Sequence, residues 1–149
     1  MVLSHPSRRR HIEVTAHSQA TPDAVFALLG DGSTWPRWSP IEAFELERAG
    51  DPPPEGVGAI RVFRRGRTTG RDQIVEVVPG RRLGYVSLSG LPVRDYQAHV
   101  ELEPAGDGTT IRWQASFAPK VPGTGWVVER GLGRFLDQCA EGLAKHAAQ

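Results

Sequence analysis

The chain has 149 residues, of which 39% are hydrophobic and 23% charged, a composition typical of one soluble globular domain with a core of its own. A formal net charge of +1 argues against a nucleic-acid binder, which needs a strong basic excess on one face. No apolar stretch approaches the roughly 18 residues of a membrane span. The single cysteine, Cys139, rules out a disulfide within the chain and predicts a cytoplasmic protein.

The N-terminal segment 1–10 contains Arg8, Arg9 and Arg10 and no apolar run, which predicts a flexible basic tail before a single domain over residues 11–147. An alternative is that these arginines touch an acidic partner. Apolar and polar residues then alternate strictly over 11–17, which predicts a half-buried strand. Thr21 and Pro22 next provide an N-cap and a first helical residue, so a short helix is expected up to Gly30.

Segment 31–40 predicts a second short helix or an ordered loop, and it carries two tryptophans that must bury apolar area. Trp35 and Trp38 are expected either to close the core or to line the mouth of a cavity. The chain up to residue 118 then predicts an antiparallel meander, because turn signals rich in glycine and proline separate short alternating segments. The expected strands are 41–48, 59–65, 69–78, 83–89, 94–103 and 110–118.

A long amphipathic helix is expected from about Thr124, because apolar residues recur at spacings of three and four. The apolar stripe consists of Val128, Leu132, Phe135, Leu136, Cys139, Ala140 and Leu143. Gly131, Gly133 and Gly142 interrupt this helix, although glycine weakens a helix by up to about 1 kcal/mol relative to alanine. Two explanations stay open: close approach to a strand or room for a ligand, or simple tolerance by the packing.

This order of elements resembles the helix-grip fold of the START-like (SRPBCC, Bet v 1-like) superfamily, and more narrowly its bacterial polyketide cyclase/dehydrase-type proteins. The resemblance covers residues 11–144 and rests on a capped helix, a glycine turn and alternating strands; the segments that carry it are 20–29, 35–40, 56–59, 75–79, 83–85, 96–102 and 108–113. It implies an α+β fold in which a curved antiparallel sheet of about seven strands surrounds a long C-terminal helix. It implies no shared catalytic motif, since members of the superfamily bind lipids, hormones or polyketides, and some are enzymes.

The chain lacks the common signatures of metal and nucleotide sites. Its five histidines form no pair at ligand spacing with Cys139, and no glycine-rich phosphate loop occurs, so no metal and no cofactor are expected. Asp95, Gln97, His99 and Glu101 share one face of a predicted strand, where a histidine between carboxylates is able to act as a general base. The alternative, which the opposite apolar face favours, is a solvated outer face of the sheet. Catalytic residues therefore remain unidentified.

The apolar strand faces and the helix stripe predict which side chains line a cavity between the sheet and the helix. These candidate ligand-binding residues are Arg61, Phe63, Tyr85, Tyr96, Trp113 and Phe135. Arg61 shares strand parity with Phe63 and would hold an anionic or enolate oxygen if that face points inward. If Ile60 and Val62 point inward instead, Arg61 is solvated. The two tyrosines are expected to donate hydrogen bonds to a carbonyl or hydroxyl of the ligand, or else to bond each other or the backbone.

Three functions are compatible with these features. The first is binding of a small hydrophobic molecule, lipid or polyketide-like, in the cavity. The second is an enzyme of polyketide cyclase, aromatase or dehydratase type, in which Arg61, Tyr85 or Tyr96 polarises a carbonyl. The third is a protein-interaction module that uses a sheet edge or the arginines. Either a monomer or a homodimer is compatible with the sequence.

Overall fold

The computed structural model describes residues 9–149, so the predicted basic tail lies outside the described residues except for its last two arginines. Arg10 already belongs to the first strand, β1 (Arg10–Ser18). Two short helices follow, α1 (Pro22–Leu29) and α2 (Trp35–Trp38), joined by a single 3-10 turn at Gly32–Thr34. Thr21 caps α1 as expected, because its side chain accepts a hydrogen bond from the Ala24 N–H at 3.2 Å.

The meander forms six further strands in chain order. They are β2 (Ala43–Arg48), β3 (Ile60–Arg65), β4 (Thr68–Val78), β5 (Arg82–Ser89), β6 (Val93–Ala105) and β7 (Gly108–Pro119). All pairings are antiparallel, and the sheet order is β1-β7-β6-β5-β4-β3-β2. The chain therefore forms the seven-stranded α+β helix-grip fold that the sequence predicts.

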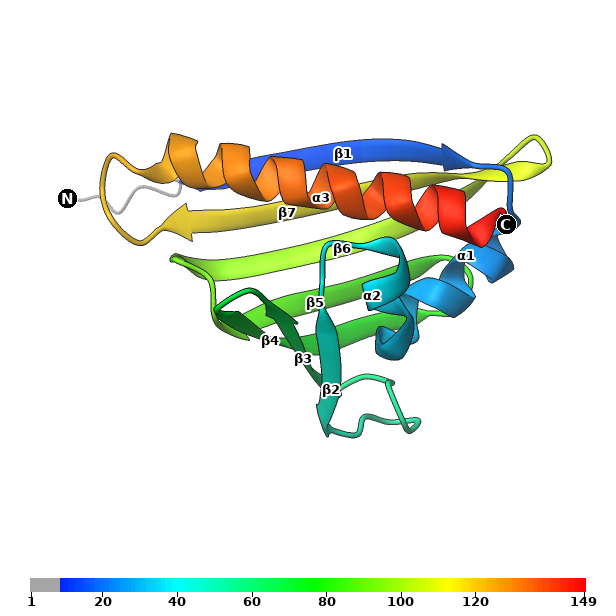
Figure 1. Cartoon of the computed structure of the whole chain (residues 1–149), viewed down its shortest axis with the longest axis horizontal. Coiled ribbons are helices and arrows are strands. Elements are labelled where there is room, and N and C mark those ends of the chain that lie inside the picture. Colours follow the sequence, from blue (N-terminus) through cyan, green and yellow to red (C-terminus); the bar gives the residue numbers. More distant parts are fainter. Residues whose placement is uncertain (1–8) are drawn as a thin grey trace.

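The long helix α3 (Gly125–Ala147) lies along β1 and β7 on one face of the sheet (Figure 1). In the same view β2 runs nearly perpendicular to β1, because each strand is rotated relative to its neighbour and the sheet curves around the helix. Leu136, Cys139, Ala140 and Leu143 of α3 are fully or almost fully buried against this face. None of the helices described over residues 9–149 is long and apolar enough to cross a membrane.

The three glycines of α3 occupy different surroundings. A Cβ at Gly142 would overlap the backbone carbonyl of Trp38, so this glycine allows α2 to lie directly against α3. A Cβ at Gly133 would meet only Ile12, at an ordinary contact distance of 3.9 Å, and one at Gly131 would meet nothing within 4 Å. Close approach explains Gly142 alone, and the neighbour is the helix α2 rather than the strand expected from the sequence. The packing merely tolerates the other two glycines.

Candidate functional site

A cavity of about 480 Å³ lies between α3 and the face of the sheet that this helix covers. Side chains from α2, from β3 to β6 and from α3 contribute to its lining. Five of them are aromatic: Trp35, Phe63, Tyr85, Tyr96 and Phe135. A mostly apolar hollow with a few polar groups is the usual form of a site for a small molecule.

Four of the six residues predicted from the sequence line this cavity, namely Phe63, Tyr85, Tyr96 and Phe135. Arg61 and Trp113 do not line it, although both are buried behind its walls at 2% and 0% exposure. Trp35 both lines the cavity and packs in the core, since its ring stacks on Phe63 with the ring centroids 4.7 Å apart.

Arg61 points inward with Phe63, but its guanidinium is already occupied by protein groups. Its Nε donates to the Glu55 carboxylate at 2.7 Å, and its Nη2 donates to the Leu29 carbonyl at 3.2 Å. The same carboxylate accepts the Gly32 N–H at 2.9 Å. Burial lowers the pKa of Arg61, and the neighbouring Glu55 charge opposes that effect. Arg61 thus ties the 51–56 loop to the sheet rather than presenting a free donor to the cavity.

Trp113 lies behind Tyr85 and orients its hydroxyl. The indole N–H of Trp113 donates to the Tyr85 oxygen at 3.1 Å, so the phenolic proton of Tyr85 points elsewhere. A hydrogen bond from Tyr85 acts to lower the pKa of Tyr96, so the two hydroxyls also interact with each other. Burial raises the pKa of both Tyr85 and Tyr96, so both keep their protons over the physiological range. The two rings lie 6.5 Å apart, so the cavity offers two O–H groups on neighbouring strands.

Asp72 on β4 is one of four polar or charged lining residues that sequence reasoning missed, the others being Glu42, Arg65 and Thr68. Its carboxylate is accessible from the cavity, yet the surrounding protein withdraws it from bulk water and raises its pKa from 3.8 to about 7. Arg61 lies opposite Asp72 in the register of β3 and β4. Its charge lowers the pKa of Asp72 but offsets the effect of burial only in part. At neutral pH this carboxyl is close to its midpoint, where a group both gives and takes a proton readily.

The alternation of inward and outward residues along β4 gives only a weak indication in the sequence that Asp72 points inward. Ile74 is buried on the inner face, and Asp72 and Gly70 share its parity on β4. The intervening residues Arg71 and Gln73 are also polar, so no apolar alternation marks which face of residues 70–73 points inward.

The raised pKa of Asp72 predicts a stability that falls as pH rises. The folded chain keeps this proton up to about pH 7, whereas the unfolded chain releases it near 3.8, so the stabilisation present below pH 4 is lost through pH 7. Asp72→Asn removes the effect. Between pH 5 and pH 8 the free energy of unfolding of the variant should rise by about 1 to 2 kcal/mol relative to that of the wild type. This figure is reduced to allow for water in the cavity.

Urea unfolding of both proteins at the two pH values measures this difference, because other titrating groups cancel between wild type and variant. Asp137→Asn, a change at an exposed position of α3, is the matched control and should shift stability equally at both pH values. If the free energy of unfolding of Asp72→Asn changes between the two pH values as much as that of the wild type, the raised pKa of Asp72 is refuted.

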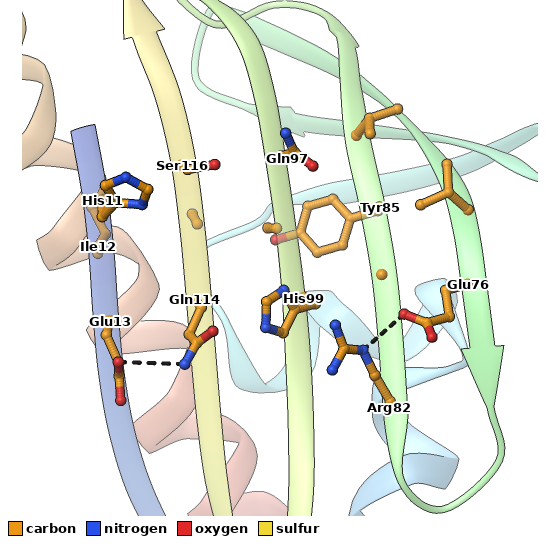
Figure 2. A pocket seen from close by; sticks show the side chains of 15 residues that line it. His11, Ile12, Glu13, Glu76, Arg82, Tyr85, Gln97, His99, Gln114 and Ser116 are labelled. Atoms are coloured by element: carbon orange, nitrogen blue, oxygen red, sulfur yellow. Dashed lines mark hydrogen bonds and ion pairs between the residues drawn. The ribbon is translucent and has the colours of Figure 1, made fainter. Parts of the chain in front are cut away.

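A second hollow, of about 420 Å³, lies on the opposite, outer face of the sheet (Figure 2). One row across five paired strands contains Glu13, Gln114, His99, Gly84 and Glu76, and the missing side chain of Gly84 creates the depression. The polar groups here engage one another: Glu13 accepts from Gln114 at 3.3 Å, and Glu76 pairs with Arg82 at 2.8 Å, both drawn as dashed lines in Figure 2.

The outer hollow is the weaker candidate for a ligand site. The floor residues Ile12, Tyr85, Ala98 and Ala115 are buried and belong to the core on the other side of the sheet. His99 lies 3.9 Å from Glu101, and both side chains remain about one-third exposed. The row of polar residues on β6 is therefore an outer, solvated face, and the inner cavity is the candidate site.

A curved antiparallel sheet that holds a long C-terminal helix over an internal cavity defines a START-like helix-grip protein. The sequence matches the family model of polyketide cyclase / dehydrase and lipid transport proteins over residues 9–148, and the chain belongs to this family. No match was found among curated proteins.

Solved structures share the fold over most of their length. A START superfamily protein from Mycobacterium smegmatis superposes with a TM-score of 0.79 at 14% identity, covering 92% of this chain and 96% of the other. A Thermobifida fusca protein solved by NMR gives 0.73 at 27% identity and covers 91% and 93%. Ara h 8.0201 gives 0.75 at 14% identity and covers 93% and 97%. These similarities concern the fold and assign no ligand.

Proposed function

We propose that the protein binds a small hydrophobic molecule in the inner cavity, with its one polar group directed at Asp72, Tyr85 and Tyr96. The observation that carries this proposal is the combination of five aromatic walls with a carboxyl and two phenolic hydroxyls in one 480 Å³ hollow. Apolar walls supply affinity, and the few polar groups fix the orientation of the ligand. We further propose a cytoplasmic location, which the single buried cysteine supports.

Gly70 offers a direct test, because it lines the cavity and its Cβ would meet only the Phe63 carbonyl, at 4.0 Å. Gly70→Phe should fill the cavity without a backbone clash. Thr69→Phe adds a phenyl group at the adjacent exposed position, whose side chain points to the opposite face of β4. N-phenyl-1-naphthylamine, which fluoresces when desolvated, reports binding in a titration.

We expect the wild type and Thr69→Phe to bind the dye alike, and Gly70→Phe to bind at least about tenfold more weakly, since it displaces most of the buried contact area. Equal binding by all three proteins would place the dye elsewhere on the surface. A wild type that never enhances the fluorescence would mean that the cavity does not admit ligands.

A second candidate function is proton-transfer catalysis of the polyketide cyclase, aromatase or dehydratase type, and the position of Asp72 favours it. A carboxylate with a pKa of about 7 is suited to remove an α-proton from a bound 1,3-diketone, while a tyrosine hydroxyl donates to the developing enolate oxygen. Exchange of the α-hydrogens of pentane-2,4-dione in D₂O, followed by NMR, should be accelerated by the wild type. Asp72→Asn should lose this acceleration, and an equal rate in both would exclude Asp72 as the base.

A further inference from the structure

The charged groups Arg61, Glu55 and Asp72, which lie around the cavity, do not balance. Arg61 and Glu55 neutralise each other through a 2.7 Å ion pair, with side chains only 3% and 9% exposed. Asp72 forms no hydrogen bond or ion pair of its own within residues 9–149, and it feels Arg61 only as a more distant charge. Once Asp72 is ionised, the three groups together carry one negative charge, and its carboxylate faces the cavity.

The aromatic walls are of the kind that attracts cations, because the face of each ring carries negative potential. The protein already places a guanidinium over two of the cavity-lining rings. The Arg61 guanidinium lies 5.6 Å from the Trp35 ring centroid, and that of Arg65 lies 5.3 Å from the centroid of Phe135. Phe63, Tyr85 and Tyr96 have no such partner in residues 9–149, and they line the same hollow as Asp72.

The other charged groups of the lining, Glu42 and Arg65, sum to zero, so they leave the net charge of the lining at that of Asp72. Glu42 and Asp72 are its two carboxylates, and Arg65 is its one cation. Within the described part of the chain, residues 9–149, Glu42 accepts the Gly66 N–H at 3.0 Å and forms no ion pair, so that contact does not neutralise its charge. A carboxylate that faces rings without a cation of their own is an arrangement that recognises an ammonium group, through an ion pair and cation–π attraction together.

We propose that the ligand of this cavity is a hydrophobic amine, whose protonated nitrogen pairs with Asp72 while its apolar body lies against the aromatic walls and Leu132. This inference rests on the proposed function, since it names the chemical class that the cavity selects. A neutral alcohol of the same shape would fill the same space and lose the ion pair. A fatty acid would place a second negative charge beside Asp72 and bind more weakly still.

Displacement of N-phenyl-1-naphthylamine by three matched eight-carbon compounds tests the proposal at pH 8. Octylamine should displace the dye at a concentration at least about tenfold lower than 1-octanol, because a hydrogen bond to a charged group in a desolvated site contributes at least that much. Octanoate should be the weakest of the three. In Asp72→Asn the amine and the alcohol should displace the dye within about twofold of each other.

The control variant is Asp137→Asn, which removes a carboxylate at an exposed position of α3 and should keep the full preference for the amine. Two results would overturn the inference: an alcohol that binds the wild type as well as the amine does, or an amine preference that survives in Asp72→Asn. In both cases the alcohol still displaces the dye, so binding of a hydrophobic molecule stands while the amine class fails. Dye binding that none of the three compounds reverses would overturn both proposals.

The same titration at several pH values gives a second readout. The groups that act on Asp72 are Arg61 on β3, Tyr85 on β5 and Tyr96 on β6, with Cys139 of α3 beyond the two tyrosines. Burial keeps the two tyrosines and Cys139 protonated, and the hydrogen bond to Glu55 favours the charged form of Arg61. Of these groups, Asp72 is therefore the one that changes charge between pH 5 and pH 8. Octylamine is cationic throughout this range. Its advantage over 1-octanol should therefore grow with pH in the wild type and stay flat in Asp72→Asn; a flat advantage in both proteins would overturn the inference.

Discussion

Replacing Arg61 by methionine is expected to lower the free energy of unfolding by about 3 to 5 kcal/mol, because it leaves the Glu55 carboxylate buried without its partner. The change keeps most of the apolar volume of the side chain, so the loss reports the stranded charge rather than a cavity. It also removes one of two donors to the Leu29 carbonyl, which accepts from Arg61 at 3.2 Å and from the Trp35 indole N–H at 3.2 Å. Urea denaturation followed by circular dichroism measures the effect.

Two further variants show whether the stranded charge is the cause. Arg61→Met combined with Glu55→Gln removes both charges and keeps an oxygen for the Gly32 N–H, so it should recover at least half of the loss. Arg64→Met breaks the pair between Arg64 and Glu45, whose side chains are 47% and 62% exposed, and should cost less than about 1 kcal/mol. A loss for Arg61→Met no greater than that for Arg64→Met would contradict this account of the buried pair.

Gly142→Ala is expected to destabilise the fold by about 3 kcal/mol or more, although alanine is the better helix former. The added methyl group would overlap the Trp38 carbonyl, so α3 must move away from α2 or bend. The displacement would also strain the hydrogen bond in which the Ser18 hydroxyl donates to the Ala144 carbonyl at 2.7 Å. Thermal and urea unfolding of the variant measure the loss.

Gly131→Ala is the matched control, since it makes the same change in the same helix where a Cβ meets nothing within 4 Å. It should stabilise the protein by up to about 1 kcal/mol through helix propensity alone. Two variants that shift stability in the same direction would show that propensity, not the contact with α2, governs both positions.

The fold was predictable because each element carries a local signal of its own. The cap at Thr21, the alternation in the strands and the three-four spacing from Val128 to Leu143 each fix one element, and short turns dictate antiparallel neighbours. Chain order then leaves few ways to arrange a meander and one long helix. The close approach at Gly142 was only one of two explanations open at that level, since it depends on where α2 lies.

The candidate site was predictable only where an apolar neighbour fixes the parity of a strand. Tyr96 lies on a strand with clear alternation and Tyr85 shares the parity of Leu83, and both line the cavity. Trp113 has as clear a strand signal as Tyr96 but is buried behind the wall, because parity fixes the face of the sheet and not the contact with the cavity. Asp72 lies among polar neighbours on β4, so the pattern leaves its direction undetermined. The ion pair of Glu55 with Arg61 could not be predicted for another reason. Glu55 lies in a proline-rich loop, and only the folded chain brings it to Arg61.

The pairing of the first strand with the last has a consequence for how the chain matures on the ribosome. Every other neighbour in the sheet is joined by a local connection, but Ser18 of β1 pairs with Thr109 of β7, about 90 residues later. At a synthesis rate of roughly 5 to 20 residues per second, β1 waits for roughly 5 to 20 seconds before its partner exists. During that interval its apolar face has neither β7 nor α3 to cover it. The nascent chain therefore exposes hydrophobic surface of the kind that makes incompletely folded chains prone to aggregate.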